Sequence, residues 1–426
     1  MGAMANERPE KWSRIHKTVL LVAWLGWTFD IMDAAIFNLA KRGMVTEVLG
    51  NPQRYAAEGP SLEALLLTVF LIGWSAGGLV FGWLSDRYGR LKVLALTILL
   101  YSAFTGLTAL CHTLPQFGFV RFMTGLGVGG EWAVGAAWVA ESVPDKTRAK
   151  AASWLQSAAT FGPVLAATAN LVLAHWDWRA LFVFGAFPAL LTFVLRHRSF
   201  AHETETIVVI DRGPYRPTKA LWKTTIAALL LGTAGIGTAQ NVTFWLPNFV
   251  TAVSQGLANA EIQARQSQAL YSLHVGTLIG VFLVPWLCEL FGRKKTLLLC
   301  FIVSPLSVAL VATVAKTFSL LLLTAPLMSV FSIGIGAAFA LYFPELFPRA
   351  FRAMGAGIAY NGGRIIAAQF SLLTAALIES SRGNVAKSMV QTAFVLAIGG
   401  LALLGLPETK GRPLETVGED FGVPST

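Results

Sequence analysis

The sequence predicts an all-α membrane protein of twelve transmembrane helices arranged in two six-helix halves. Three observations predict this fold class: an apolar composition, a series of apolar runs long enough to cross a bilayer, and an internal repeat. Of the 426 residues, 55% are hydrophobic and only 13% are charged, whereas a soluble protein carries about 25% charged residues. The composition therefore excludes an ordinary soluble globular domain.

Twelve runs of about 20 mostly apolar residues follow one another, and each is long enough to cross a bilayer as a helix. The predicted spans lie near residues 18–40, 61–82, 92–112, 115–139, 150–173, 179–196, 222–250, 268–288, 296–314, 318–341, 353–378 and 388–406. A long polar stretch separates the sixth span from the seventh. We therefore expect a first six-helix bundle at 18–196, a cytoplasmic linker at 197–221, a second six-helix bundle at 222–406 and a cytoplasmic tail at 407–426.

Lysine and arginine are distributed unevenly between the two sides of the predicted bundle. Of these 33 residues, 23 lie in segments on the side of the N-terminus and 8 in loops on the opposite side, while Arg121 and Arg364 lie within spans. Basic residues gather on the cytoplasmic side of membrane proteins. Both termini are therefore predicted to be cytoplasmic, in a multi-pass protein of the cell inner (plasma) membrane. The same distribution accounts for the net charge of +10 without nucleic-acid binding.

The two halves repeat a pattern of charged residues and turn formers. "SDRYGRLK" follows the second span and "CELFGRKK" the eighth, while "ESVPDKTRA" follows the fourth span and "ELFPRAFRA" the tenth. The matching acids and bases are Asp86 and Arg90, Glu289 and Arg293, Glu141 and Arg148, and Glu345 and Arg352. We expect these side chains to tie helices together as parts of a gate, and ordinary solvated loops are the alternative. Two parallel halves that enclose a central site are typical of a transporter.

These motifs carry a family resemblance. "GWLSDRYGRLK" resembles the signature between spans 2 and 3 of the major facilitator superfamily. "RFMTGLGVGGEW" and "PETKG" (407–411) resemble the fourth span and the tail of its sugar-porter and organic-acid branches. The acids of the first span, "GGEW" and "PELFPRAFRAMGAG" are most similar to proton-coupled organic-acid symporters, which include sialate, lactate/pyruvate and aromatic-acid carriers. The resemblance implies the major facilitator fold.

Asp33 and Arg121 lie inside apolar spans, where a charge is costly unless it is paired or faces a water-filled cavity. A rise of about 1.5 Å per residue places Asp33 roughly 22 Å up a core about 30 Å thick, and Arg121 roughly 9 Å below its outer edge. The similar depths predict an ion pair that breaks when Asp33 is protonated, and a permanent pair that only fixes packing is the alternative. The resemblance implies the same coupling role, since a span 1 aspartate and a span 4 arginine couple protons in related symporters.

Asp30 lies one turn before Asp33 on a similar face of the helix. Two neighbouring carboxylates in a low dielectric cannot both ionise at low cost, which suits a group that loads and releases a proton. A hydrogen-bonded structural aspartate is the alternative. Glu131, in "GGEW", is a third buried acid, either a member of a proton relay or a helix-packing residue.

Arg364 lies roughly 17 Å into the eleventh span, near the midplane of the bilayer. Its fork of donors matches a carboxylate in two-pronged fashion. We therefore expect Arg364 to receive the carboxylate of a substrate. A fixed salt bridge to Asp30 or Glu131 is the alternative.

Neutral polar residues are expected to complete the substrate site. Tyr360 and Asn361 precede Arg364 by four and three residues and share its face. Gln240 and Asn241 lie midway along the seventh span. Sugar porters usually carry a glutamine pair near this point, and the single glutamine here weakens the sugar interpretation. His274, on the eighth span, is predicted to be a hydrogen-bonded packing residue.

No metal site, cofactor or enzyme activity is predicted, because no ligand cluster or nucleophile–base set is visible. Cys111, Cys288 and Cys300 are expected to be buried as small apolar side chains. The glycines of "GLGVGG" (125–130) are expected to allow close helix packing.

The sequence thus predicts a proton-coupled symporter that imports a small organic anion, such as a monocarboxylate or sialic acid, by alternating access. Its partners would be this substrate, protons and the lipid bilayer, and it is expected to act as a monomer. A proton-coupled sugar or polyol symporter and a non-transporting membrane ligand sensor are the alternatives.

Overall fold

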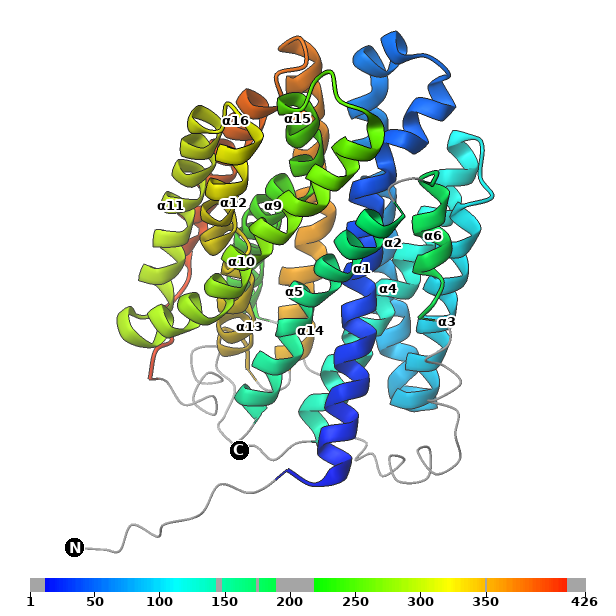
Figure 1. Ribbon diagram of the computed structural model, residues 1–426. Helices are drawn as coiled ribbons and strands as arrows, with labels where there is room; N and C mark the ends of the chain where they lie inside the picture. The colour runs from blue at the N-terminus through cyan, green and yellow to red at the C-terminus, as the bar shows by residue number, and fades with distance from the viewer. Residues whose placement is uncertain (1–11, 143–147, 174–175, 189–217, 349–350, 412–426) are drawn as a thin grey trace, which may run out of the picture.

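The computed structural model describes residues 12–142, 148–173, 176–188, 218–348 and 351–411. Over these residues the chain is helical without any β-strand, and long helices run side by side between two ends of the molecule (Figure 1). The predicted fold class is therefore confirmed. Most of the predicted linker at 197–221 lies outside the described residues, so the domain boundaries stay a prediction.

In this part of the chain the helices form twelve segments, in two sets of six. The first set comprises α1 (Arg14–Leu49), α2 (Pro52–Tyr88), α3 (Arg90–Thr108), α4 (Leu114–Ser142), α5 (Arg148–Val172) and α6 (Arg179–Gly185). The second set comprises α9 (Lys219–Val253), α10 (Asn259–Phe291), α11 (Arg293–Val314), α12 (Phe318–Ser332) with α13 (Ile335–Glu345), α14 (Arg352–Gly357) with η2 (Ile358–Gly362) and α15 (Gly363–Ser380), and α16 (Val385–Ala397) with η3 (Ile398–Gly405). By length and composition, eight segments of the described chain qualify as membrane spans.

Three residues turn the chain between α1 and α2. Gly50 has a positive φ of 66°, the Asn51 side chain accepts hydrogen bonds from two backbone N–H groups of α2, and Pro52 is the first helical residue. These are strong signals for the end of one helix and the start of the next. Both helices therefore extend beyond the predicted spans 18–40 and 61–82, and the residues between those spans are helical apart from this turn. We call this side of the molecule the Gly50 end.

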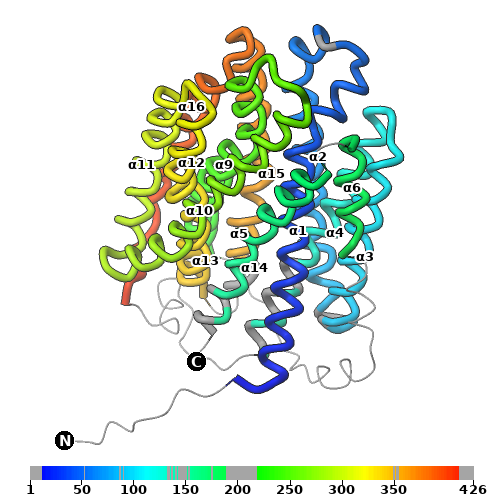
Figure 2. Tube along the Cα trace, in the orientation of Figure 1, coloured from blue at the N-terminus to red at the C-terminus, as the bar shows by residue number. Residues whose placement is uncertain are grey.

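The opposite side, which we call the Gly89 end, carries two matching turns. Gly89 joins α2 to α3 with a φ of 93°, and Gly292 joins α10 to α11 with a φ of 97°. Glycine suits both turns because other residues rarely adopt a positive φ. The repeat visible in the sequence thus corresponds to a repeated helix turn. Helix α1 begins on this side and η3 ends on it (Figure 2).

Helices α2 and α4 pack against each other through glycines. A Cβ atom added to Gly77 would overlap the carbonyl oxygen of Leu126, and one added to Gly129 would overlap the carbonyl oxygen of Trp74. Gly125, one turn before Gly129, makes a backbone contact of the same kind. The packing role predicted for "GLGVGG" is therefore confirmed. This contact also fixes the backbone that carries the Trp74 side chain.

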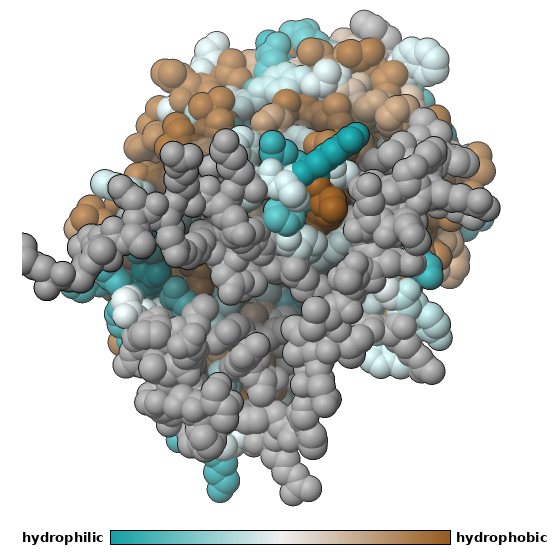
Figure 3. Space-filling view, turned by 90° about the horizontal axis from the view of Figure 1, so that it is seen from below, coloured by the Kyte–Doolittle hydropathy of each residue, from teal (hydrophilic) through white to brown (hydrophobic). Residues whose placement is uncertain are grey.

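The outer flanks of the helices are apolar and exposed. Leu79, Leu323 and Leu404 are 72%, 76% and 82% exposed. Many residues along the upper rim of the molecule are apolar, shown in brown, when it is viewed from the Gly89 end (Figure 3). Contiguous exposed apolar surface of this kind marks contact with a membrane. The flanks therefore face lipid.

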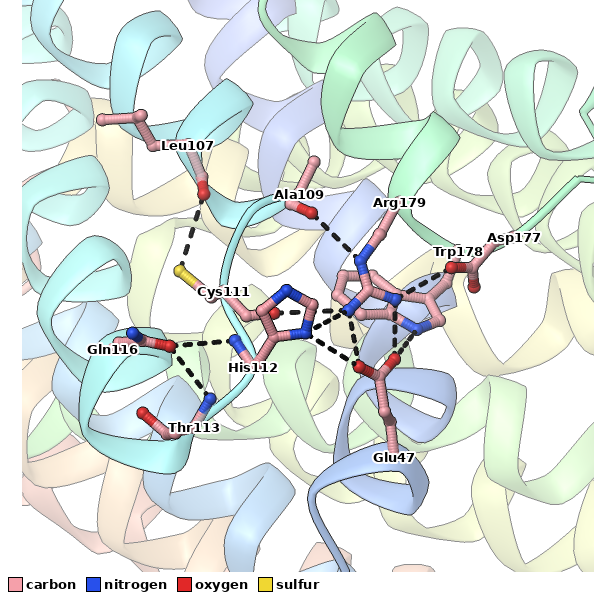
Figure 4. A network of polar contacts seen from close by, with 10 residues as sticks. All are labelled: Glu47, Leu107, Ala109, Cys111, His112, Thr113, Gln116, Asp177, Trp178 and Arg179. Atoms are coloured by element: carbon pink, nitrogen blue, oxygen red, sulfur yellow. Dashed lines mark hydrogen bonds and ion pairs between the residues drawn. The ribbon is translucent and has the colours of Figure 1, made fainter. Parts of the chain in front are cut away.

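A polar network ties helices of the first set together at the Gly50 end (Figure 4). The Arg179 guanidinium, at the start of α6, binds both carboxylate oxygens of Glu47 on α1, at 2.5 and 2.6 Å. Arg179 Nε donates to the carbonyl oxygen of Ala109, just after α3, at 3.0 Å. A two-pronged contact between arginine and carboxylate is strong and directional. It therefore fixes the ends of α1, α3 and α6 relative to one another.

Candidate functional site

A cavity of about 190 Å³ lies between the two sets of helices. Its walls come from α1, α2 and α5 on one side, and from α9, α10, α13, η2 and α15 on the other. Most lining side chains are apolar or aromatic, among them Trp27, Trp74 and Phe339. The polar lining residues are Asn38, Gln156, Gln240, Thr243, His274, Tyr360 and Arg364. An apolar pocket with a few polar groups is typical of a binding site for a small molecule.

Arg364 places a cation in the wall of this cavity and is only 8% exposed. Its guanidinium carbon lies 3.9 Å from the centre of the Trp74 ring and 4.8 Å from that of the Tyr360 ring. The π-helix η2 ends directly before α15, and such wide turns occur frequently at functional sites. Both are cation–π contacts, and they leave the Nε donor of the guanidinium without an acceptor among the described residues, so this donor remains available for an anion.

Arg364 has no carboxylate partner among the described residues. The ion pairs of the described chain join other residues, so the salt bridge to Asp30 or Glu131 that the sequence left open is not formed. The Arg364 Nε atom is buried and has no hydrogen-bond acceptor in this part of the chain. A buried cation without an anion is costly. The site is therefore suited to bind an anionic ligand that is not part of the protein.

Of the four neutral residues predicted to join Arg364, two line the cavity and two do not. Gln240 and Tyr360 are lining residues. As a correction, Asn241 packs α9 on α16, where its amide donates to a backbone carbonyl at 2.8 Å. Asn361 is also outside the cavity lining, and its carbonyl accepts a hydrogen bond of 2.8 Å from a serine of α2. Residues one apart on a helix point about 100° apart, so sequence proximity does not place both on one face.

Asp33 and Arg121 form an ion pair that is fully buried within the first set. Arg121 Nη1 lies 3.2 Å from Asp33 Oδ2, and both side chains are 0% exposed. The other carboxylate oxygen accepts a hydrogen bond of 2.5 Å from Thr105 on α3. The Arg121 guanidinium also lies 4.3 and 4.1 Å from the ring centres of Phe37 and Phe70. Loss of either charged partner would leave an uncompensated buried charge, at a cost of about 3–5 kcal/mol.

Asp30 and Glu131 form a second buried acidic site beside this pair. Both are 0% exposed, and neither carboxyl accepts a hydrogen bond from a donor group of the described residues. The two carboxyl groups interact with each other, and Asp30 also senses the charges of Asp33 and Arg364. Two adjacent carboxyl groups in a low dielectric cannot both be ionised at low cost. This arrangement is chemically able to hold one proton between the two groups.

His274 differs from its prediction. It lines the cavity on α10 and is 4% exposed. Neither of its ring nitrogens has a hydrogen-bond partner in the described chain. The prediction that His274 is a hydrogen-bonded packing residue is therefore wrong, because no group of the described residues pairs with either ring nitrogen.

Lys41 and Glu63 form a buried charge pair that was not predicted from the sequence. Lys41 Nζ lies 3.3 Å from the Glu63 carboxylate, and the two side chains are 1% and 0% exposed. Lys41 also donates to the carbonyl oxygen of Phe244 on α9 at 2.6 Å, while Asn248 on α9 donates to Glu63 at 3.1 Å. The pair thus joins the two sets of helices at the Gly50 end. Lys41 follows the apolar run of α1 without a break, which is the signal that could have placed it in the helix.

Three of the eight predicted gate side chains can be located. Arg293 lies between Glu289 and Glu345, at 2.8 and 3.0 Å from their carboxylates. The repeated acids and base of the second half therefore form a charge cluster at the Gly89 end. The side chains of Asp86, Arg90, Glu141, Arg148 and Arg352 lie outside the described residues.

The tail extends this cluster. Glu408 of "PETKG" accepts hydrogen bonds of 2.9 to 3.1 Å from four backbone N–H groups, those of Arg293, Lys294, Thr409 and Lys410. Burial raises the pKa of the Glu408 carboxyl, but these four donors together outweigh burial and hold the pKa below its usual value. Glu408 therefore stays ionised at neutral pH and anchors the tail to the turn between α10 and α11.

The cysteines take no part in these sites. Cys111, Cys288 and Cys300 are buried and form no disulfide, as expected for small apolar side chains. In the described part of the chain, no group of three or more histidine, cysteine, aspartate or glutamate side chains could hold a metal ion.

Comparison with known proteins assigns the chain to a family. The sequence model of the Major Facilitator Superfamily matches residues 23–282, and that of the family "Sugar (and other) transporter" matches residues 315–421. A Bacillus subtilis protein named as a niacin/nicotinamide transporter is 29% identical over 408 residues, which cover 94% of this chain and 98% of that protein. A Cupriavidus pinatubonensis protein named as a 4-methylmuconolactone transporter is 29% identical over 424 residues, which cover 95% of this chain and 93% of that protein.

A solved structure supports the fold. The inward-open structure of the xylose transporter XylE from Escherichia coli matches with a TM-score of 0.70 at 19% identity, over 95% of this chain and 100% of that chain. At this identity the likeness concerns the fold alone. Because the first family match covers more than half of the chain, we conclude that this protein belongs to the major facilitator superfamily of membrane transporters.

Proposed function

We propose that this transporter is a proton-coupled symporter that imports a small organic anion. The observation that carries the proposal is Arg364, a buried cation in an apolar cavity without a carboxylate partner among the described residues. An arginine fork binds a carboxylate through two parallel hydrogen bonds. The relatives named as niacin and 4-methylmuconolactone transporters support a small organic acid as the substrate.

The proton would be held by Asp30 and Glu131. Asp30 attracts the Arg364 guanidinium, so an ionised Asp30 competes with a substrate carboxylate for the same positive charge. When a proton neutralises this acidic site, the Arg364 guanidinium can bind the substrate carboxylate without competition from Asp30. Each ligand then favours binding of the other, which is the reciprocal coupling that symport requires. The neighbouring pair of Asp33 and Arg121 is the second candidate for the proton step.

The Gly50 end is proposed to face the outside of the cell, because the loops on that side carry few basic residues. Among the described residues, several hydrogen bonds join the two sets of helices at this end. In addition to the Lys41–Glu63 pair, Asn170 donates to Ser267 at 2.8 Å, and Tyr271 donates to Thr168 at 2.9 Å. The structure would therefore represent a state closed to the outside. Alternating access would open the Gly50 end by breaking these contacts.

Replacing Lys41 by methionine is expected to open the Gly50 end. The change leaves Glu63 buried without its cation. This destabilises the closed state by about 3–5 kcal/mol. Spin labels on cysteines introduced at the exposed positions Arg54 and Glu261 should report a longer distance in Lys41→Met than in the parent protein. Adding Glu63→Gln removes the orphaned charge and should restore part of the closed population. An unchanged distance distribution in Lys41→Met would exclude the pair from closure.

Uptake into liposomes tests the proposed function. With an acidic outside and an alkaline inside, the reconstituted protein should accumulate radiolabelled nicotinate or benzoate, and a protonophore should stop the accumulation. Xylose serves as the matched neutral solute and should not accumulate. Accumulation of xylose without either carboxylate would favour the sugar symporter. Ligand binding without any flux would favour the membrane sensor.

A further inference from the structure

We infer that His274 determines substrate specificity by hydrogen-bonding a polar atom of the substrate remote from its carboxylate. The inference rests on the proposed function, because it takes Arg364 to hold the carboxylate. It narrows the substrate to a monocarboxylate of about one six-membered ring in size. That ring carries a nitrogen or hydroxyl group away from the carboxylate.

The first support is the state of the His274 side chain. The ring is 4% exposed, and both of its nitrogens are buried without a partner in the described chain. Buried polar groups are nearly always hydrogen-bonded, and an unsatisfied one in a native structure requires an explanation. His274 is a lining residue of the cavity, so we take a ligand in that cavity, met by a small turn of the imidazole ring, as the missing partner.

The second support is the position of His274 relative to Arg364. His274 lies on α10 and Arg364 on α15, so two separate helices carry the two polar groups into one cavity. Leu270, one turn before His274, and Ile333 and Ile335 make the adjoining wall apolar. In such a wall a polar side chain fixes the orientation of a ligand. A substrate whose carboxylate binds Arg364 would therefore form a second polar contact with His274.

The third support is the size of the cavity. A cavity of roughly 150 Å³ holds one benzene molecule. The volume of about 190 Å³ found here leaves space for one such ring with a small substituent. The cavity therefore has room for a single-ring acid.

The chemistry of imidazole defines which polar atoms fit. A neutral imidazole has one nitrogen that donates and one that accepts. It can therefore donate to a pyridine nitrogen or accept from a phenolic hydroxyl group. A plain phenyl ring offers neither and would leave both imidazole nitrogens unsatisfied.

Three probes of equal ring size test this assignment: benzoate, nicotinate and meta-hydroxybenzoate. Their Kd values would be measured by calorimetry on the purified full-length protein. The wild type should bind nicotinate or meta-hydroxybenzoate about tenfold more tightly than benzoate. In His274→Leu this preference should disappear, because binding of the polar probe weakens while the Kd of benzoate stays the same. A residue with a purely structural role would change all three affinities together.

Two further variants keep the test decisive. His274→Gln retains an amide donor and acceptor and should keep part of the preference, which covers the case in which His274→Leu does not fold. His112→Gln alters an exposed histidine at the Gly50 end, whose side chain is 68% exposed, and should keep the wild-type preference. If both His274 variants kept the wild-type preference for the polar probes over benzoate, the role of His274 would be overturned, while the proposed function would stand. Failure of the wild type to bind any of the three carboxylates would overturn the proposed function with it.

Discussion

Arg364→Met is expected to abolish carboxylate binding while leaving the fold intact. Loss of a buried, charge-assisted contact costs about 2–5 kcal/mol, which is a factor of roughly 30 to several thousand in Kd. Methionine keeps an apolar stem to pack beside the Trp74 ring, which lies 3.9 Å from the guanidinium. Because Arg364 forms no salt bridge with a carboxylate of the described residues, its removal breaks no ion pair there. The thermal midpoint without ligand should therefore be at least as high as that of the wild type.

Two arginine variants give this experiment its controls. Arg364→Lys keeps the charge but loses the planar fork, so its Kd should fall between those of the wild type and Arg364→Met. Arg265→Met removes an arginine of α10 that pairs with Glu261 at 3.2 Å outside the cavity, and should bind like the wild type. Calorimetry with nicotinate or benzoate gives the Kd values. An unchanged Kd in Arg364→Met would show that the carboxylate binds elsewhere. A strongly lowered thermal midpoint would show that Arg364 is a structural residue instead.

Asp30→Asn is expected to separate binding from coupling. Asparagine can replace a protonated carboxyl group beside Glu131, so the substrate cavity should keep its shape and its affinity. It cannot carry a proton, so a pH gradient should no longer drive accumulation. The ratio of internal to external substrate should fall to about one, while exchange of labelled for unlabelled substrate continues, because exchange requires no net proton release. Liposome uptake and counterflow on the same preparation measure the two properties.

Asp33→Asn is the matched comparison, one turn away on the same helix. It leaves Arg121 buried without its carboxylate, so it should lower the stability of the protein by about 3–5 kcal/mol. A thermal unfolding curve of each variant therefore distinguishes the two aspartates before any transport is measured. If Asp33→Asn stayed stable and lost coupling while Asp30→Asn kept uphill uptake, the proton step would belong to Asp33.

Local signals in the sequence predicted most of the fold. Run length and composition identified the spans, and the glycines at positions 89 and 292 marked two equivalent turns that the structure shows with nearly equal φ values. The predicted spans 18–40 and 61–82 are shorter than α1 and α2 because helix length was inferred from apolar length alone. The Gly50–Asn51–Pro52 signal, which ends one helix and begins the next, is visible in the sequence and marks where the turn lies.

The candidate site was predictable only in part. Depth along a helix placed Asp33 near Arg121, and the structure pairs them at 3.2 Å. Depth does not define rotation about the helix axis, so Asn241 and Gln240 were predicted together although only Gln240 lines the cavity. For the same reason, the sequence did not show that His274 lines the cavity.

The sequence by itself determined that this chain crosses a membrane in two repeated halves and that it carries charges inside its spans. These are properties of single segments, since apolar length, turn residues and basic residues act locally. Only the tertiary structure decided which charges are paired. Lys41 and Glu63 together join the two sets of helices. In the described chain, Arg364 lines the cavity without a carboxylate partner, and His274 lines it without a hydrogen-bond partner. The reason is physical: a pair between distant segments depends on how helices rotate and cross, and no single helix encodes either.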